Sequence, residues 1–320
     1  MPKTDVGKHL AAVVAPFKSD LSLDERALRR VCQHVLELGG IDALVVNAHA
    51  SEVDSMTTEE RVRMVEIAGE EARAKNRKIV SGVVPCPGSN AGAVATARTM
   101  EKAGADSLLL LGPGWFTWGV QMLPEVVETY VRDVASAVSV PVLYFVAGDY
   151  TGIKYTPELV QRICSVDNVV GIKDTMWTPH GFDANLKAIR ELGKPMEVLT
   201  GNDTCLYENF LSGADGTLLI LHCVLGAPIL EMFDAVKKGD TGRGLNIHRT
   251  YERLVELLFQ PPMIRMPSKT KYALSLIGVL HETTTRPPVP PPSDEEKEAI
   301  RAEMERLGFF GAKTAIAKGS

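Results

Sequence analysis

The stretch AGADSL at residues 103–108 recurs with small changes as GGIDAL at 39–44 and as SGADGT at 212–217. All three copies have a glycine at the second position, an aspartate at the fourth, and the start of an apolar run after it. Glycine is favoured directly after a helix because it adopts the left-handed conformation without a steric penalty. The three copies therefore predict a repeated unit in which a helix ends and a strand begins.

Apolar runs of strand length alternate with stretches of helical period along the chain. The runs are rich in Val, Ile and Leu without clean alternation, which is typical of parallel strands buried on both faces. Eight such strands and eight helices predict an α/β fold, a (β/α)8 TIM barrel. An open doubly wound sheet is the alternative, but AVVAPFKSD (12–20) is not the glycine-rich loop expected after its first strand. The expected strands are 10–17, 43–48, 78–84, 107–112, 141–146, 169–174, 197–203 and 216–220, and the expected helices are 23–38, 57–75, 91–103, 124–137, 157–164, 182–192, 205–211 and 228–238.

A helical extension follows the predicted barrel. We assign residues 1–240 to the barrel, 241–310 to the extension and 311–320 to a loose tail. Within the extension, helical patterns cover 241–258, 268–280 and 294–306, and the run PPVPPP at 287–292 predicts a stiff polyproline spacer.

The composition excludes several classes of protein. The chain has 35 Lys and Arg and 40 Asp and Glu among 320 residues, a net charge of −5. This charge argues against a nucleic-acid partner and gives no reason to expect binding to anionic membranes. The longest uncharged apolar stretch, 216–230, is too short to span a bilayer, and the N-terminus lacks a signal-peptide pattern. Five scattered cysteines without a C-x-x-C pair favour a reducing compartment. We therefore expect a soluble cytoplasmic protein.

Lys173 is the first candidate for chemistry. It lies near the end of the apolar run NVVGIKD (168–174), and barrel active sites collect at the C-terminal ends of strands. Burial lowers the pKa of a lysine, and a neutral amine can attack a ketone to form a Schiff base. The alternative is a lysine that reaches out to solvent from the strand end.

Other polar residues occupy neighbouring strand ends. Tyr144, near the end of the preceding strand, is a candidate proton shuttle, unless its ring packs in the barrel with its hydroxyl bound to the backbone. Small residues around His49 would let backbone N–H groups approach an anion, and Thr57 with Glu60 predicts a helix-capping box. Gly201, Asn202 and Asp203 end the seventh strand, where they position substrate oxygens or form a tight turn.

A metal site is a competing interpretation. The seven histidines form no H-x-x-x-H or H-E-x-x-H pair. His49, His180 and His222 nevertheless fall in different predicted loops at one end of the barrel, so a three-histidine site is an alternative to imine chemistry.

Short motifs along residues 10–292 give a family resemblance. They are APF (15–17), E-x-x-x-M-T-x-x-E (52–60), GADSLLLLGP (104–113), PVLY (141–144), GIKD (171–174), GND (201–203) and RPPVPPP (286–292). In these motifs the sequence resembles the dihydrodipicolinate synthase and N-acetylneuraminate lyase family. The resemblance implies a (β/α)8 barrel with a C-terminal helical extension, usually a homotetramer, that acts on pyruvate or related 2-oxo acids without metal or organic cofactor. It also implies that Lys173 forms the Schiff base and that Tyr144 moves protons.

The chain departs from the family pattern at three places, and one of them is Pro113-Gly114-Trp115-Phe116, where the family commonly has Pro-Tyr-Tyr. The usual Gly-Thr-Thr-Gly-Glu is Ala48-His49-Ala50-Ser51-Glu52, so both threonine hydroxyls are missing and we expect His49 to take over the proton relay. The segment 145–152 lacks the arginine with which dihydrodipicolinate synthases bind the second substrate. We therefore expect an enzyme other than dihydrodipicolinate synthase itself.

The expected function is that of a class I lyase, an aldolase or hydratase-aldolase acting on pyruvate or a related 2-oxo acid. Trp115 and Trp177 fall in predicted loops at the catalytic end and cations are scarce there, which favours a substrate with an uncharged, apolar or aromatic distal group. Alternatively, Trp115 and Phe116 line a subunit interface.

The alternative functions are a 2-oxo acid sugar dehydratase that uses the same imine, and a catalytically idle barrel that serves as a sensor or binding protein. The predicted catalytic residues are Lys173, Tyr144 and His49, and the predicted substrate-binding residues are Ala48, Ala50, Ser51, Trp115, Trp177, Gly201 and Asn202.

Overall fold

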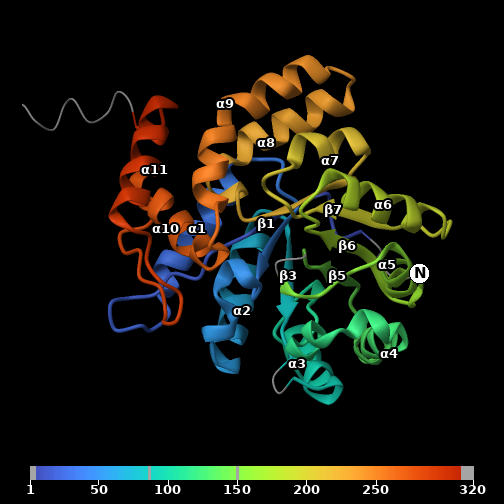
Figure 1. Cartoon of the computed structure of the whole chain (residues 1–320). Helices are drawn as coiled ribbons and strands as arrows, with labels where there is room; N and C mark the ends of the chain where they lie inside the picture. The colour runs from blue at the N-terminus through green and yellow to red at the C-terminus, as the bar shows by residue number, and fades with distance from the viewer. Residues whose placement is uncertain (1–4, 86–87, 149–150, 311–320) are drawn as a thin grey trace, which may run out of the picture.

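Eight parallel strands close into a barrel in the order β1 to β8, which confirms the predicted (β/α)8 fold (Figure 1). The structure is a computed structural model that describes residues 5–85, 88–148 and 151–310. The predicted loose tail, 311–320, lies outside the described residues. The strands are β1 (His9–Ala12), β2 (Ala43–Val46), β3 (Lys78–Val83), β4 (Ser107–Leu110), β5 (Val142–Val146), β6 (Val169–Asp174), β7 (Glu197–Thr200) and β8 (Gly216–Leu219).

Helices surround the barrel as an outer layer (Figure 1). Most begin where the sequence supplies a capping side chain that accepts a hydrogen bond from the first turn, as Asp24, Ser89, Thr156 and Thr178 do. The predicted capping box of Thr57 is present at the start of α2. The helices are α1 (Glu25–Glu37), α2 (Thr58–Ala74), α3 (Asn90–Lys102), α4 (Pro124–Ala135), α5 (Pro157–Ser165), α6 (Pro179–Arg190), α7 (Leu206–Ser212) and α8 (His222–Lys237).

Five predicted boundaries differ from the structure by more than two residues. They are the ends of β1, of β7 and of the helix expected at 268–280, and the starts of α6 and α8. The run 10–17 leaves the ladder after Ala12, and Phe17 instead forms isolated bridges with Leu23 and Thr284. Helix α8 begins at His222, six residues before the expected start at 228, and continues through a kink at Leu225. The sequence signal was misleading because proline is favoured in the first turn of a helix, which made Pro228 look like a start.

The strand register determines which side chains face the barrel interior. Residues side by side in a parallel sheet point to the same face, and successive residues alternate. Lys173 on β6 is side by side with Phe145 on β5 and with Leu199 on β7. Tyr144 is side by side with Ile172 and therefore points to the opposite face, toward the helices.

The extension folds back over the C-terminal end of the barrel. It contains α9 (Thr241–Phe259), which packs against α8, and α10 (Met266–Leu276) and α11 (Asp294–Arg306), drawn in red in Figure 1. The proposed boundary at 240 falls directly before α9. The predicted proline spacer at 287–292 packs against the barrel: Thr284, just before it, pairs with Phe17, and its first prolines cover the barrel mouth. Among the described residues, no helix has both the length and the apolar character that crossing a bilayer requires.

Candidate active site

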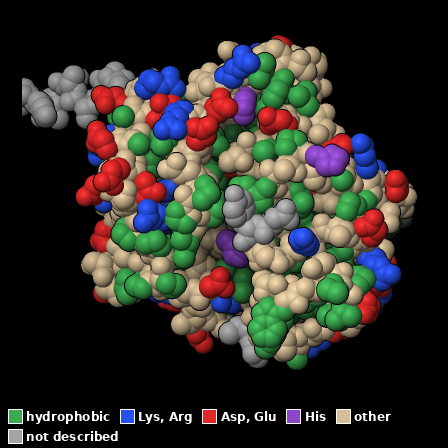
Figure 2. Space-filling view, in the orientation of Figure 1, with side chains coloured by type: hydrophobic (Ala, Val, Ile, Leu, Met, Phe, Trp, Pro, Cys, Tyr) green, Lys and Arg blue, Asp and Glu red, His purple; other side chains and the backbone are tan. Residues whose placement is uncertain are grey.

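A cavity of about 480 Å³ opens at the C-terminal ends of the strands. The loops after β2, β5, β6 and β7 line its floor, and segments of the extension line its other side. Figure 2 shows hydrophobic side chains gathered in the middle of this face, with most charged side chains nearer its outline. Active sites of this fold lie at this end of the barrel, so the cavity is the candidate active site.

Lys173 lies at the base of the cavity. Its Nζ lies 4.6 Å from the centre of the Phe145 ring, its neighbour in the strand register. Burial lowers the pKa of Lys173 to about 8, and the Asp203 carboxylate opposes this shift. At pH 7 about a tenth of the amine is therefore neutral and able to act as a nucleophile, far more than for an unperturbed lysine.

His49 enters the same cavity from the loop after β2. It begins the short turn η1 (His49–Ser51), and its ring lies edge-on to Phe145 with 5.5 Å between ring centres. Burial lowers the pKa of His49, Lys173 adds to this effect, and Asp54 opposes it. Two ionisable groups, the imidazole and the amine, thus flank one aromatic ring.

Of the other predicted residues in this loop, only one lines the cavity. Ala50 lines the cavity, whereas Ala48 and Ser51 are buried. The Ser51 hydroxyl donates to the carbonyl of Val13, and the Ser51 N–H closes the turn onto Ala48. Ser51 therefore shapes the loop.

Asp203 is a cavity residue whose role the sequence left open. It follows β7 and lines the cavity, and its carboxylate accepts a hydrogen bond from the N–H of Leu221, at the start of α8. Burial raises the pKa of Asp203 to about 7, against the lowering effect of Lys173. The GND motif located it, but only the fold shows that it faces the Lys173 amine through the cavity.

Gly201 and Asn202 support this floor in different ways. A Cβ atom at Gly201 would lie 2.5 Å from Cε of Lys173, so the absence of a side chain makes room for the lysine. The amide of Asn202 donates to the carbonyl of Met176 and accepts from the backbone and hydroxyl of Thr204. Asn202 lines the cavity, but these bonds tie two loops together.

The structure does not bring Tyr144 into the cavity. Its ring is fully buried and its hydroxyl lies 3.0 Å from the hydroxyl of Tyr155. Burial raises the pKa of Tyr144 well above its usual range, and Tyr155 and Tyr130 add to the shift. The family resemblance pointed to this tyrosine, but side chains alternate along a strand, and Phe145 holds the position beside Lys173.

The two predicted tryptophans differ in position relative to the cavity. Trp177 lines the cavity close to Gly148, where an added Cβ would lie 2.3 Å from the indole ring. Trp115 does not line the cavity of its own chain: it is 61% exposed and packs edge-on against Trp118, which is 80% exposed. Tyr150, another aromatic residue of these loops, lies outside the described residues.

The three-histidine alternative is not formed. His222 is fully buried, and its Nε2 lies 2.8 Å from the hydroxyl of Thr217, whereas His49 opens into the cavity. Among residues 5–85, 88–148 and 151–310, no three His, Cys, Asp or Glu side chains are grouped as metal ligands. A second, smaller cavity of about 180 Å³ between α7, α8 and α9 shares Asp203 and Thr204 with the site but contains neither Lys173 nor His49.

Comparison with known proteins identifies the family to which this barrel belongs. The sequence profile of the Dihydrodipicolinate synthetase family matches residues 5–307. The chain belongs to this family. Among its relatives, a 4-hydroxy-tetrahydrodipicolinate synthase of Chlorobaculum parvum (strain DSM 263 / NCIMB 8327) is 30% identical over 302 residues, which cover 93% of this chain and 96% of the relative. The corresponding enzyme of Chlorobium phaeobacteroides (strain BS1) is 30% identical over 316 residues, 97% of this chain and 99% of the relative.

Solved structures show the same fold. YagE, a prophage protein of the dihydrodipicolinic acid synthase family from E. coli K12, in complex with pyruvate, has a TM-score of 0.85 at 21% identity and covers 95% of this chain and 99% of its own. Dihydrodipicolinate synthase from Thermotoga maritima has a TM-score of 0.87 at 23% identity, with 96% and 100% covered. As a family member, the chain is a class I lyase of the pyruvate-dependent, Schiff-base-forming type.

Proposed function

We propose that the chain is an aldolase or hydratase-aldolase that forms or cleaves a carbon–carbon bond next to the pyruvoyl carbon of a 2-oxo acid. The observation that carries this proposal is the position of Lys173, a buried amine of lowered pKa at the base of the cavity. Its substrate differs from that of the curated synthases, because Lys173 is the only Lys or Arg among the described residues that line the site.

The chemistry starts with Lys173. Its neutral amine adds to the C2 carbonyl, and loss of water from the carbinolamine leaves an imine. The imine draws electrons from C3, a proton leaves C3, and the resulting enamine attacks an aldehyde carbonyl to form the new bond. Water then hydrolyses the imine and frees the amine.

His49 and Asp203 assist Lys173 in different ways, by proton transfer and by charge stabilisation. His49 removes the C3 proton and returns it to the aldehyde oxygen, because its imidazole shares the cavity with Lys173. Ser51 and Glu52 use their N–H groups to close the turn, so the earlier N–H groups, of His49 and Ala50, hold the 2-oxo acid carboxylate. Asp203 stabilises the positive charge of the protonated imine.

The distal group of the substrate is uncharged and apolar or aromatic. Phe145 and Trp177 line the cavity together with uncharged residues of the extension. A second carboxylate or a phosphate would need a fork of donors such as arginine, and Asp54 and Asp203 would repel it.

The test is borohydride trapping combined with product analysis. Pyruvate and borohydride should attach the reduced adduct to the peptide that contains Lys173. A panel of aldehydes compared by kcat/KM should favour aromatic and aliphatic tails over phosphorylated or dicarboxylic ones by about tenfold or more. Loss of water without bond cleavage would instead identify a 2-oxo acid sugar dehydratase, and trapping without turnover would identify a binding protein or sensor.

We propose that the functional unit is a homotetramer. Trp115, Trp118 and Met122 form an exposed apolar patch after β4, with Met122 80% exposed, and a patch of this kind fits a second copy of the chain. Sedimentation of the Trp118→Lys variant should show smaller assemblies than the wild type.

We place the protein in the cytoplasm, because Cys32, Cys164, Cys205 and Cys223 are all unpaired.

A further inference from the structure

Two segments of the C-terminal extension cover the candidate active site, and we call them together the roof. Every roof side chain is uncharged, in contrast to the floor, where His49, Lys173 and Asp203 lie. The roof consists of Phe259, Met263, Ile264, Met266, Pro267, Pro287, Pro288 and Val289.

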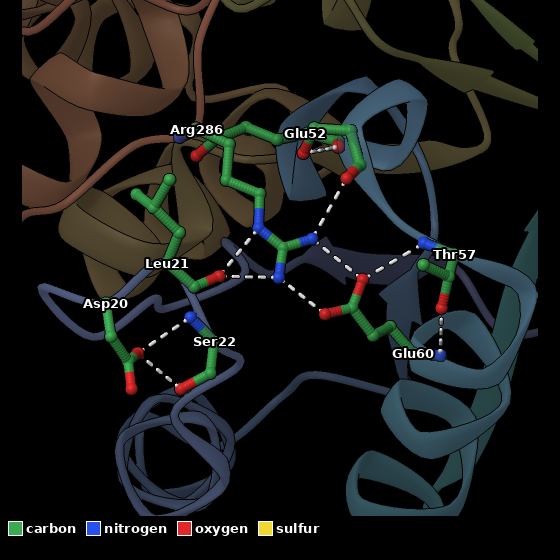
Figure 3. A network of polar contacts seen from close by, with 8 residues as sticks. Asp20, Leu21, Ser22, Glu52, Thr57, Glu60 and Arg286 are labelled. Carbon is green, nitrogen blue, oxygen red and sulfur yellow. Dashed lines mark hydrogen bonds and ion pairs between the residues drawn. The ribbon is translucent and has the colours of Figure 1, made fainter.

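Arg286 directly precedes the second roof segment and anchors it. Its guanidinium forms a two-pronged ion pair with Glu60 on α2, and it also donates to the carbonyls of Leu21 and Ser55 (Figure 3). The bond from Nη1 to Glu60 is 2.7 Å long, and that from Nη1 to the Ser55 carbonyl is 2.9 Å long. A planar fork of donors fixes direction as well as distance, so Arg286 holds the roof to the loop and helix after β2.

Glu52 ties the same roof to the loop that carries His49. One carboxylate oxygen accepts from the ammonium of Lys271 on α10, and the other accepts from the backbone N–H of Arg286. Lys271 is fully buried and also donates to the carbonyl of Thr284. Both cations lie over the ring of Phe17, at 4.6 Å for Lys271 and 4.2 Å for Arg286.

These contacts do more than hold the extension in place. Replacing a buried ion pair by apolar groups is often neutral or stabilising, so its burial alone is weak evidence of a stabilising role. The apolar roof contacts are non-directional and can slide, whereas the fork of Arg286 fixes where Pro287, Pro288 and Val289 sit above the floor.

We propose that the roof is the binding surface for the distal group of the substrate, and that Arg286 is a positioning residue that sets the distance between this surface and Lys173. The proposal rests on the aldolase function proposed above. The ligand class is an aldehyde, or the corresponding part of a 2-oxo acid, with an uncharged aromatic or branched aliphatic tail. A short aldehyde reaches the floor without touching the roof.

The experiment compares two acceptors in the intact protein. Pyruvate is combined with benzaldehyde or with acetaldehyde, and kcat and KM are measured for wild type, Arg286→Met and Arg286→Lys. We expect Arg286→Met to raise KM for benzaldehyde roughly tenfold with less than about a threefold change in kcat, while both constants for acetaldehyde stay within about threefold. Arg286→Lys keeps the positive charge but not the fork of donors, so its KM for benzaldehyde should lie between those of the wild type and Arg286→Met.

A matched control breaks a similar ion pair elsewhere. Arg63 donates to both carboxylate oxygens of Glu25 at 2.8 and 2.9 Å on the outer helices, away from the roof. Arg63→Met should leave the ratio of the two KM values unchanged. Should Arg286→Met not fold, Val289→Thr leaves the fork intact and places a hydroxyl in the roof, and it should raise KM for benzaldehyde alone.

The outcomes separate the two proposals. If borohydride traps no pyruvate on wild-type Lys173, the aldolase function itself is wrong. If trapping occurs but Arg286→Met changes both acceptors equally or neither, or if the wild type prefers acetaldehyde, the function stands and the role of the roof is overturned.

Discussion

The floor and the roof of the cavity are built on different principles. The floor contains ionisable groups with shifted pKa values, Lys173 at about 8 and Asp203 at about 7, at the ends of strands locked in a closed ladder. The roof contains only uncharged side chains, brought in by a distant part of the chain and fixed by Arg286. We therefore expect the reaction to depend on the floor, which belongs to the rigid barrel, and the selection of the distal group to depend on the roof.

The largest expected effect is on the floor. Lys173→Met removes the nucleophile, so turnover should fall by at least about 10³-fold, and borohydride should no longer attach pyruvate to this peptide. Lys154, in the loop after β5, is exposed, so Lys154→Met is the matched control variant. Labelling that persists in Lys173→Met, or that Lys154→Met abolishes, would contradict the assignment.

The second test separates His49 from Tyr144. His49→Asn should slow turnover by about 10²–10⁴-fold, the usual value of one acid–base group. Tyr144→Phe should change kcat by no more than a few-fold, because its hydroxyl bonds Tyr155 away from the cavity. Instead it should lower the free energy of unfolding by about 1 kcal/mol, measured by urea denaturation. The reverse pattern of rates would return the proton shuttle to Tyr144.

The third test moves Lys173 without changing it. The Cβ of Gly201→Ala would lie 2.5 Å from Cε and 2.7 Å from Cγ of Lys173, so the lysine must shift. Since a displacement of about 1 Å can cost about 10²-fold in rate, we expect imine formation to slow by tenfold to about a hundredfold. Gly114→Ala is the control, because an added Cβ there meets no atom within 4 Å. Equal trapping rates in both variants would refute this packing argument.

A roof substitution should have a smaller and more selective effect. Ile264→Ser removes apolar surface above the floor, and KM for an aromatic aldehyde should rise by about threefold to tenfold while pyruvate trapping is unaffected. Val126, similarly exposed at 44% against 49%, lies on α4 away from the cavity, and Val126→Ser should alter neither constant. Slower trapping in Ile264→Ser would show that roof and floor are not separable.

The smallest expected effect is a shift in pH dependence. The rate of pyruvate trapping should rise with pH around a midpoint of about 8, as Lys173 loses its proton. The Asp203 carboxylate favours the charged amine and raises this pKa, so Asp203→Asn should move the midpoint to lower pH, by less than about one unit. Trapping rates between about pH 6 and pH 10 check the sign. A midpoint that moves upward would mean that Asp203 does not act on the amine.

Much of the fold could be read from the sequence because its signals are local. The junction at 39–44, 103–108 and 212–217, the apolar runs and the capping residues each depend on neighbours in the chain, and β6 has the bounds that were predicted. The largest exceptions are β1, which ends at Ala12, and α8, which begins before Pro228, and the bounds of β7, α6 and α10 differ by three or four residues. Long-range bridges of Phe17 override the local preference after β1, and a kink at Leu225 carries α8 past the apparent start at Pro228.

The site was only partly readable for the same reason. Lys173 stands out because a strand of apolar residues ends in an amine, and His49 stands out in a loop of small residues. The position of Tyr144 outside the cavity could not be read from the motif, because a motif match does not specify which face of a strand a side chain occupies, and a shift of one residue reverses that face. The exposed position of Trp115 could not be read either, because a loop at the correct end of the barrel need not line the cavity.

The sequence by itself determined the alternation of strands and helices and the family, and it predicted Lys173 as the nucleophile, because periodicity and short motifs are recorded within a few consecutive residues. Only the tertiary structure decided that Phe145 faces Lys173, that Asp203 shares their cavity, and that Arg286 and Glu60, 226 positions apart, fix the roof above them. Side-chain direction follows from strand register, and contacts between distant segments follow from packing. Neither is encoded at a single position in the chain.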